Sequence, residues 1–201
     1  MSEVISNSMP WAVQVGRVWF QWRSFSPLPF FLLLVVLPPE VSLSFLGLAL
    51  ALGGILLAEA VRLWAVGYAG SATRTRGDSV PQLVHAGPFR YVRNPLYLAN
   101  IALYSLAGVL FGFPGLSVLI LVFSVVEYVF IVQFEEYVLE QTFGSPYTEY
   151  MARVRRWIPR LSPAMESSNH AFSLAKALKS EKSTLLSMLV LAALYWIKSV
   201  I

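Results

Sequence analysis

Residues 95–134, PLYLANIALYSLAGVLFGFPGLSVLILVFSVVEYVFIVQF, contain two apolar stretches, 95–113 and 115–134, separated only by a Phe-Pro-Gly turn. Each stretch approaches the roughly 20 residues that an α-helix needs to cross about 30 Å of hydrocarbon. Because the turn is short, the two helices are expected to form a tight antiparallel hairpin. The residues before Pro95 and after Phe134 should therefore lie on the same side of the membrane.

The composition indicates that most of the chain lies in lipid. Hydrophobic residues make up 57% of the 201 residues, charged residues only 13%, and the mean hydropathy is +0.63. With further apolar stretches at 27–37, 41–66 and 184–201, the chain is predicted to be an all-α polytopic membrane helix bundle. We expect about five transmembrane helices in a single domain, 1–201. The stretch 27–37 is short and ends at two prolines, so it either leans on the preceding segment or forms the short arm of a hairpin.

The N-terminal residues 1–26 read as an interfacial segment. They lack the basic region, apolar core and cleavage site of a secretory signal, so the first apolar stretch is expected to stay as an anchor. From Trp11 to Phe25, aromatic residues mix with Arg17 and Arg23, a composition that suits the headgroup layer. We expect this segment to lie flat on the membrane.

Arginines gather on one side of the predicted bundle. The loop 70–94 and the segment 135–163 each contain four arginines, whereas the turns 38–40 and 112–115 contain no Lys or Arg. The positive-inside rule places both basic segments in the cytoplasm, with the N-terminus inside and the C-terminus outside an inner or plasma membrane. Residues 164–201 then form a linker and the last transmembrane helix.

Cysteine and histidine usage limits the chemistry. The chain has no cysteine and two histidines, which excludes disulfides and a thiolate nucleophile and makes a metal site improbable. We expect no metal, and catalysis would have to use oxygen and nitrogen groups.

The first polar motif, GPFRYVRNPLY at residues 87–97, precedes the hairpin. Arg90 and Arg93 supply planar cationic donors, Asn94 is a plausible N-cap, and Pro95 fits the first turn of a helix. Helix N-terminal amides beside arginines suit an anionic group such as a carboxylate or phosphate. The ordinary alternative is that these arginines only orient the helix and contact headgroups.

The second polar motif follows the hairpin. Glu135 and Glu136 are expected at the C-terminal end of the helix 115–134, where acidic groups oppose the helix dipole. They need a cationic partner, either the arginines of the first motif or a ligand. Further on, Tyr147, Tyr150, Arg153 and Arg156 recur at three-residue spacing, which gathers them on one helical face. An interfacial helix on anionic lipid would also explain these four residues.

Three ionisable residues are predicted within the bilayer. Glu59 and Arg62 are three residues apart on one helix and are expected to pair near the cytoplasmic interface. Glu127 stands alone, about two turns from Glu135, and is the better candidate for contacting a substrate inside the bundle.

The two motifs, in order and joined by an apolar hairpin, resemble the integral membrane methyltransferases grouped around isoprenylcysteine carboxyl methyltransferase and the phospholipid N-methyltransferases. The resemblance covers residues 87–159. It implies methyl transfer from S-adenosylmethionine, bound in a cytoplasmic pocket at the helix ends, to a lipophilic acceptor that comes from the bilayer. The implied cofactor-binding residues are Arg90, Tyr91, Arg93, Asn94, Pro95, Tyr97, Glu135, Glu136, Tyr147, Tyr150 and Arg153. The implied catalytic residues are Glu127, Glu135 and Arg156, the last as a contact to acceptor charge.

One position departs from the pattern of the family, which commonly has Arg-His-Pro where this chain has Arg93, Asn94 and Pro95. Asparagine does not titrate near neutral pH, so a general base at this position is excluded and a positioning role remains. If the acceptor is an amine, Glu127, Glu135 or Glu136 is expected to take its proton; if it is a carboxylate, an orienting arginine is enough.

Other functions remain open at this point. A membrane reductase that binds NADPH could use Arg74, Arg76 and Arg153 to hold a 2′-phosphate, although no Gly-rich dinucleotide motif is present. A non-enzymatic lipid-binding protein would account for the net charge of +4. Nucleic-acid binding is not expected because the arginines flank membrane helices. The sequence leaves the oligomeric state open.

Overall fold

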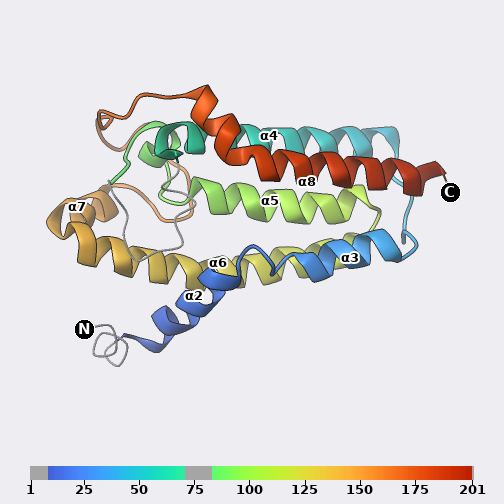
Figure 1. The fold of residues 1–201 in the computed structure, drawn as a ribbon, viewed down its shortest axis with the longest axis horizontal. Helices are drawn as coiled ribbons and strands as arrows, with labels where there is room; N and C mark the ends of the chain where they lie inside the picture. The colour runs from blue at the N-terminus through green and yellow to red at the C-terminus, as the bar shows by residue number, and fades with distance from the viewer. Residues whose placement is uncertain (1–8, 71–82, 201) are drawn as a thin grey trace.

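The protein is an all-helical bundle in the part of the chain that the structure describes. The computed structural model describes residues 9–70 and 83–200, and Figure 1 shows its helices. In chain order these are α2 (Trp11–Trp22), α3 (Leu28–Val36), α4 (Phe45–Ala69), the short η2 (Gly87–Arg90), α5 (Pro95–Leu110), α6 (Pro114–Phe143), α7 (Ser145–Arg153) and α8 (Leu174–Val200). The predicted fold class, a helical membrane bundle, is confirmed.

The α5–α6 hairpin forms as predicted. Gly112 adopts a positive φ of 81°, and Phe113 N donates to Gly108 O at 2.9 Å, which closes the turn. Pro114 begins α6, where its missing N–H costs nothing. A Cβ on Gly108 would lie 2.9 Å from Ser117 Cα, so the small residue lets the two helices touch.

Not every predicted span is long enough to cross a membrane by itself. Among the described residues, α4, α6 and α8 are long and apolar enough, and α5 is a shorter apolar helix. The predicted span 27–37 contains the nine residues of α3, which rise only about 14 Å. α3 ends at Val36, with Leu37 as its C-cap, because Pro38 and Pro39 follow.

Two predicted helix limits are wrong. α6 does not end at residue 134 but runs to Phe143, because neither Gly nor Pro interrupts it before Gly144. Glu135 and Glu136 therefore lie inside the helix, and the argument from the helix dipole does not apply to them. α8 begins at Leu174, ten residues before the predicted start at 184, so part of the predicted linker is helical.

α2 packs across α6 rather than standing apart from the bundle (Figure 1). Gly16 is the closest point, because a Cβ there would lie 2.0 Å from the carbonyl oxygen of Phe130. Aromatic pairs flank the crossing, with ring centroids 5.4 Å apart for Phe20 and Phe134. Whether the segment also lies in the headgroup layer stays a prediction.

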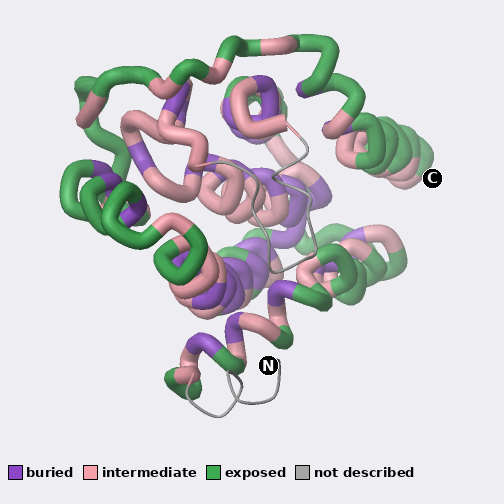
Figure 2. Tube along the Cα trace, turned by 60° about the vertical axis from the view of Figure 1, so that its left-hand side comes forward, coloured by how far each residue is buried: buried purple, intermediate pink, exposed green. Residues whose placement is uncertain are grey.

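α8 lies against α4 and leaves one side of the bundle open. Figure 2 shows most of α8 exposed, whereas buried residues concentrate on α5 and α6. At its C-terminal end Lys198 donates to the carbonyl oxygens of Leu34 and Leu37, at 2.5 Å each. Near its other end Glu181 pairs with Arg62 of α4 at 2.5 Å. Between these two attachments the space between α3, α5 and α8 is a cavity.

Gly16→Ala should destabilise the protein, because the added methyl group collides with the Phe130 backbone. We expect a loss of about 1–3 kcal/mol, although Ala is intrinsically the better helix former by about 1 kcal/mol. Thermal unfolding in detergent, followed by circular dichroism, measures the change.

Gly53→Ala is the matched control, since a Cβ at Gly53 would meet no atom within 4 Å among the described residues outside its own turn of α4. It should leave the melting temperature unchanged or raise it. Equal melting temperatures for Gly16→Ala and the wild type would contradict the close α2–α6 crossing.

Candidate active site

The two polar motifs meet at the α7 end of the bundle, as the hairpin predicts. The backbone after α7 runs beside the backbone before α5, because Arg93 N donates to Arg155 O at 2.9 Å and Arg160 N donates to Tyr91 O at 3.0 Å. Ala164 N adds a third bond, to Arg90 O at 2.9 Å. The segment 154–165 is thereby held as a cover over the start of α5.

Glu136 joins the three parts of this end. Its Oε1 forms an ion pair with Arg93 Nη2 at 3.0 Å, and its Oε2 forms a second one with Arg156 Nη2 at 2.5 Å. Arg156 Nε also donates to Glu136 at 3.1 Å. The carboxylate is buried, with 7% of its surface exposed. The predicted cationic partner is therefore found for Glu136, as two guanidiniums.

Arg93 and Asn94 hold the neighbouring backbone in place. Arg93 Nη1 donates to Met151 O at 3.1 Å, while its buried Nε has no hydrogen-bond partner among the described residues. Asn94 occupies the N-cap position of α5, but its side chain does not cap the helix. Instead its Nδ2 donates to Arg156 O at 3.1 Å. The predicted side-chain cap is therefore wrong, and Asn94 contacts the cover.

Glu135 is held differently from Glu136. Its carboxyl group lies beside the Tyr97 hydroxyl, and Tyr97 stacks on Tyr128 with ring centroids 4.6 Å apart. Among the described residues no guanidinium forms an ion pair with it, although Arg23 lies near enough to act on it electrostatically. Glu135 is thus the less constrained of the two carboxylates.

Two tyrosines of α7 close this end. Tyr150 donates from its hydroxyl to Phe89 O at 2.8 Å, and Tyr147 packs against it with ring centroids 5.9 Å apart. Burial raises the pKa of Tyr147 well above its usual value, and Glu136 raises it further. Burial likewise raises the pKa of Tyr150, although Arg93 opposes the shift. Both hydroxyls therefore stay protonated at neutral pH.

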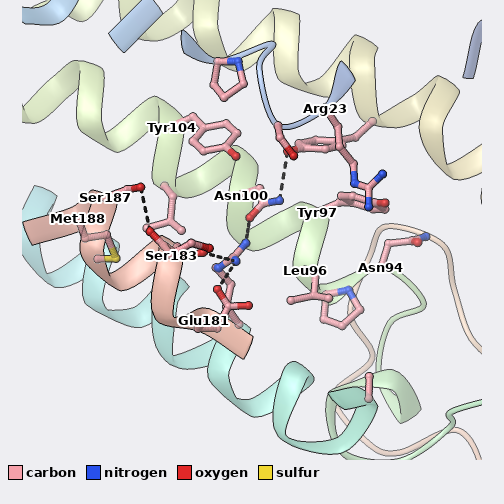
Figure 3. Close-up of a pocket in the computed structure, with 18 of the residues that line it drawn as sticks. Arg23, Asn94, Leu96, Tyr97, Asn100, Tyr104, Glu181, Ser183, Ser187 and Met188 are labelled. Carbon is pink, nitrogen blue, oxygen red and sulfur yellow. Dashed lines mark hydrogen bonds and ion pairs between the residues drawn. The ribbon is translucent and has the colours of Figure 1, made fainter. Parts of the chain in front are cut away.

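A single cavity of about 1380 Å³ extends from this polar end along α5. Figure 3 shows Tyr97, Asn100 and Tyr104 of α5 along one side of it, with Ser183, Ser187 and Met188 of α8 across from them. The polar end is lined by Arg93, Asn94, Pro95, Tyr97, Glu135, Glu136, Tyr147 and Tyr150. The far part is apolar and is lined by Leu28, Phe31, Leu103, Ala107, Leu110, Phe111, Met188 and Leu191.

Between the two parts, a polar network crosses the bundle. Arg62 donates to Asn100 Oδ1 and pairs with Glu59 at 3.2 Å, as predicted, and with Glu181. Asn100 in turn donates to the Tyr128 hydroxyl at 3.1 Å. The network joins α4, α5, α6 and α8, and it lines the middle of the cavity.

The remaining candidate residues do not line this cavity. Arg90 Nε donates to Met165 O at 2.7 Å, and Tyr91 packs beside Trp64. Arg153 pairs with Glu149 on the surface, where both side chains are more than half exposed.

The last two candidates lie elsewhere for identifiable reasons. α7 ends at Arg153, so Arg156 is not on its face and instead binds Glu136. Glu127 lines a second cavity that is too narrow for a water molecule, and Ser26 lies near its carboxyl group. Arg74 and Arg76 lie outside the described residues.

Sequence reasoning missed several residues that line the cavity. Asn100 and Tyr104 follow the predicted Tyr97 at helical spacing within an apolar helix, and this polar face could have identified them. The sequence offers no comparable signal for Glu181 beside Arg62, because 119 residues separate them. Arg23 was assigned to the membrane surface, but it lines the cavity.

Glu136→Gln should destabilise the protein strongly, because it leaves two arginines without their carboxylate. We expect a loss of about 2–4 kcal/mol, somewhat below the cost for a fully buried pair, since the Arg156 side chain is 42% exposed. Glu149→Gln makes the same chemical change in an exposed pair and should cost less than about 1 kcal/mol. Unfolding in detergent with added denaturant compares the two, and equal losses would refute the central role of Glu136.

The buried tyrosines predict a loss of stability in alkali. Their pKa values are raised in the folded state, so the stability is fully present below the ordinary tyrosine pKa of about 10 and is lost as pH rises above it. Tyr147→Phe should lose less stability than the wild type between about pH 9 and 11. Unfolding midpoints across this range test the difference, and identical pH profiles would argue against a buried Tyr147 hydroxyl.

Comparison with known proteins assigns the sequence to a family. The sequence model of the family described as phospholipid methyltransferase matches residues 42–146, just over half of the chain. The matched part includes α4, α5 and α6 with the first polar motif and both glutamates. Comparison with curated proteins and with solved structures finds no significant match. The chain therefore belongs to the phospholipid methyltransferase family, and it is an integral membrane methyltransferase.

Proposed function

We propose that the protein transfers a methyl group from S-adenosylmethionine to a lipophilic acceptor that enters from the bilayer. The observation that carries the proposal is the single cavity, in which a charged, hydrogen-bonding end continues into an apolar trough. Its volume of about 1380 Å³ exceeds the roughly 300–1,000 Å³ of ordinary ligand pockets. It therefore offers room for a cofactor and part of a lipid together.

The residues at the polar end fit the proposed cofactor. S-adenosylmethionine supplies the methyl group on an already activated sulfonium centre. Arg93, whose buried Nε has no partner in the part of the chain that the structure describes, would hold a carboxylate, and Glu135 would accept from an amino or hydroxyl group. Tyr147 and Tyr150, kept protonated, would close the end against water.

Positioning is the main task of these residues. With an activated donor, in-line alignment of donor and acceptor supplies much of the rate. The Glu136 ion pairs with Arg93 and Arg156 fix the start of α5 against the cover, and this would keep the polar end rigid. Asn94 takes part through its bond to Arg156 O and has no role as a base.

The acceptor's chain would lie in the trough between α3, α5 and α8. The trough walls are apolar side chains, and the hydrogen bonds of Lys198 attach α8 to α3 near the C-terminal end of each helix. A hydrocarbon chain could therefore pass between these helices without unfolding them.

Glu135 is the proposed proton acceptor if the acceptor group is an amine. Glu136 is held by two guanidiniums, so both of its carboxylate oxygens are already engaged in ion pairs. Glu127 faces the second cavity. If the acceptor is instead a carboxylate, no base is needed and Arg93 is close enough to the polar end to orient it.

The polar end is proposed to face the cytoplasm of an inner or plasma membrane. The segments 83–94 and 153–160 at this end carry Arg90, Arg93, Arg153, Arg155, Arg156 and Arg160. The positive-inside rule places such segments in the cytoplasm.

Two other functions remain as alternatives. An NADPH-dependent membrane reductase is disfavoured by membership of a methyltransferase family. A lipid-binding protein without catalysis would not require the carboxylate of Glu135. The identity of the small molecule that binds distinguishes both alternatives from the proposal.

The test combines binding with transfer. Isothermal titration calorimetry on the purified full chain should show binding of S-adenosylhomocysteine and none of NADPH. Incubation with labelled S-adenosylmethionine and a total lipid extract should then yield a labelled lipid whose mass spectrum names the acceptor. NADPH binding without S-adenosylhomocysteine binding, or the absence of any labelled lipid, would contradict the proposal.

Glu135→Gln distinguishes the acceptor classes. If the labelled product is an amine, the variant should lower kcat at least about a hundredfold, as expected for loss of a general base. S-adenosylhomocysteine binding should fall far less, because the glutamine oxygen can still accept the proposed hydrogen bond from the cofactor. Glu140→Gln, on the exposed side of α6, is the matched control and should behave as the wild type. Unchanged N-methylation by Glu135→Gln would remove Glu135 as the base.

A further inference from the structure

Arg23 is a cationic residue of the cavity that the family match does not cover. It lies in the turn between α2 and α3, before the matched residues 42–146. It lines the cavity together with Ser24, Pro27 and Leu28. The side chain is thus placed where the polar end opens toward the lipid-facing trough.

The contacts of Arg23 leave most of its donors available. Nη1 donates to Phe20 O at 2.6 Å, and the guanidinium carbon lies 3.7 Å from the Phe20 ring centroid. It forms no ion pair with a carboxylate of residues 9–70 or 83–200. Because a guanidinium has five N–H donors in a planar fork, four remain for a ligand.

The surroundings of Arg23 point to an anionic ligand. Figure 3 shows its guanidinium beside Tyr97, and Glu135 lies near enough to act on the guanidinium electrostatically without an ion pair among the described residues. A cation on the wall of a membrane cavity is costly unless an anion or water compensates it. Arg23 therefore marks a cationic subsite that is separate from Arg93, which is already bound to Glu136.

The trough extends from Arg23 in the direction that a lipid chain requires. Along α5, the cavity is lined from Tyr97 to Phe111, and these positions span about 21 Å at the helical rise. One leaflet of hydrocarbon is roughly 15 Å thick. A chain whose polar group sits at Arg23 can therefore lie along α5 within one leaflet.

We propose that Arg23 binds the phosphate group of the lipid acceptor and thereby selects phosphate-bearing lipids over lipids without phosphate. The proposal rests on the proposed function and adds a subsite to it. Phosphate at Arg23 would place the adjoining headgroup near Tyr97 and Glu135. The headgroup would then lie between the phosphate subsite and the polar end formed by Arg93, Tyr147 and Tyr150.

The experiment compares two probes that share one chain and differ only in the phosphate, hexadecyl phosphate and hexadecanol. Binding to the purified full chain is measured in an uncharged detergent, without cofactor. The wild type should bind hexadecyl phosphate at least about tenfold more tightly. Arg23→Gln should lose this preference, and Arg23→Lys should keep only part of it because it retains the charge without the planar fork.

Arg17→Gln is the matched control, because it removes a positive charge from α2 at a residue that does not line the cavity. It should bind both probes as the wild type does. Melting temperatures of all variants show whether each one folds. If Arg23→Gln does not fold, the wild-type preference and Arg23→Lys still decide the outcome.

Three results would overturn the proposal. They are equal wild-type affinity for the two probes, an unchanged preference in folded Arg23→Gln, and displacement of hexadecyl phosphate by millimolar inorganic phosphate, which would make free phosphate the ligand. S-adenosylhomocysteine binding is measured separately in the same proteins. If the wild type does not bind S-adenosylhomocysteine, the proposed function is refuted while the Arg23 result stands. Failure of the proposed function and failure of the Arg23 proposal are therefore distinguishable.

Discussion

The ion pairs of Glu136 with Arg93 and Arg156 are the interaction on which the site depends. They join α6 to the start of α5 and to the segment after α7, three parts that are separated in the sequence. Buried charges are stable only when they are paired and hydrogen-bonded. Removing Glu136 would therefore detach α6 from the cover and from the start of α5, which would remain joined to each other by backbone hydrogen bonds.

The cavity combines two environments that rarely occur in one pocket. At the α7 end, carboxylates, guanidiniums and hydroxyls converge, and one helical face of α5 then changes from Tyr97, Asn100 and Tyr104 to Ala107 and Phe111. Such a gradient suits a reaction between a polar cofactor and an amphipathic acceptor. The attachment of α8 near its two ends, through Glu181 and Lys198, leaves its middle free to border the apolar part.

Much of this arrangement could be predicted from the sequence. The Phe-Pro-Gly turn indicated the hairpin, and the hairpin brought the arginines before α5 to the glutamates of α6. The pairing of Glu59 with Arg62 followed from their three-residue spacing. These successes share a cause, since each rests on local periodicity or on a connection too short to allow another geometry.

The remaining features depend on long-range packing that no local pattern encodes. The extension of α6 to Phe143 shows that charged residues do not end a helix when neither Gly nor Pro is present. The side chain of Asn94 bonds to Arg156 O because the cover lies against it, and Glu181 meets Arg62 only after α8 folds back on α4. Arg23 enters the cavity because Gly16 lets α2 cross α6 closely.

The central claim is that cofactor and lipid share one cavity, with the cofactor at its α7 end. An experimental structure of the full chain with S-adenosylhomocysteine bound would test it most directly. We expect S-adenosylhomocysteine to bind against Arg93, Glu135 and Tyr147, with the trough along α5 still open. A ligand bound outside this cavity, or one that fills the trough between α3 and α8, would contradict it.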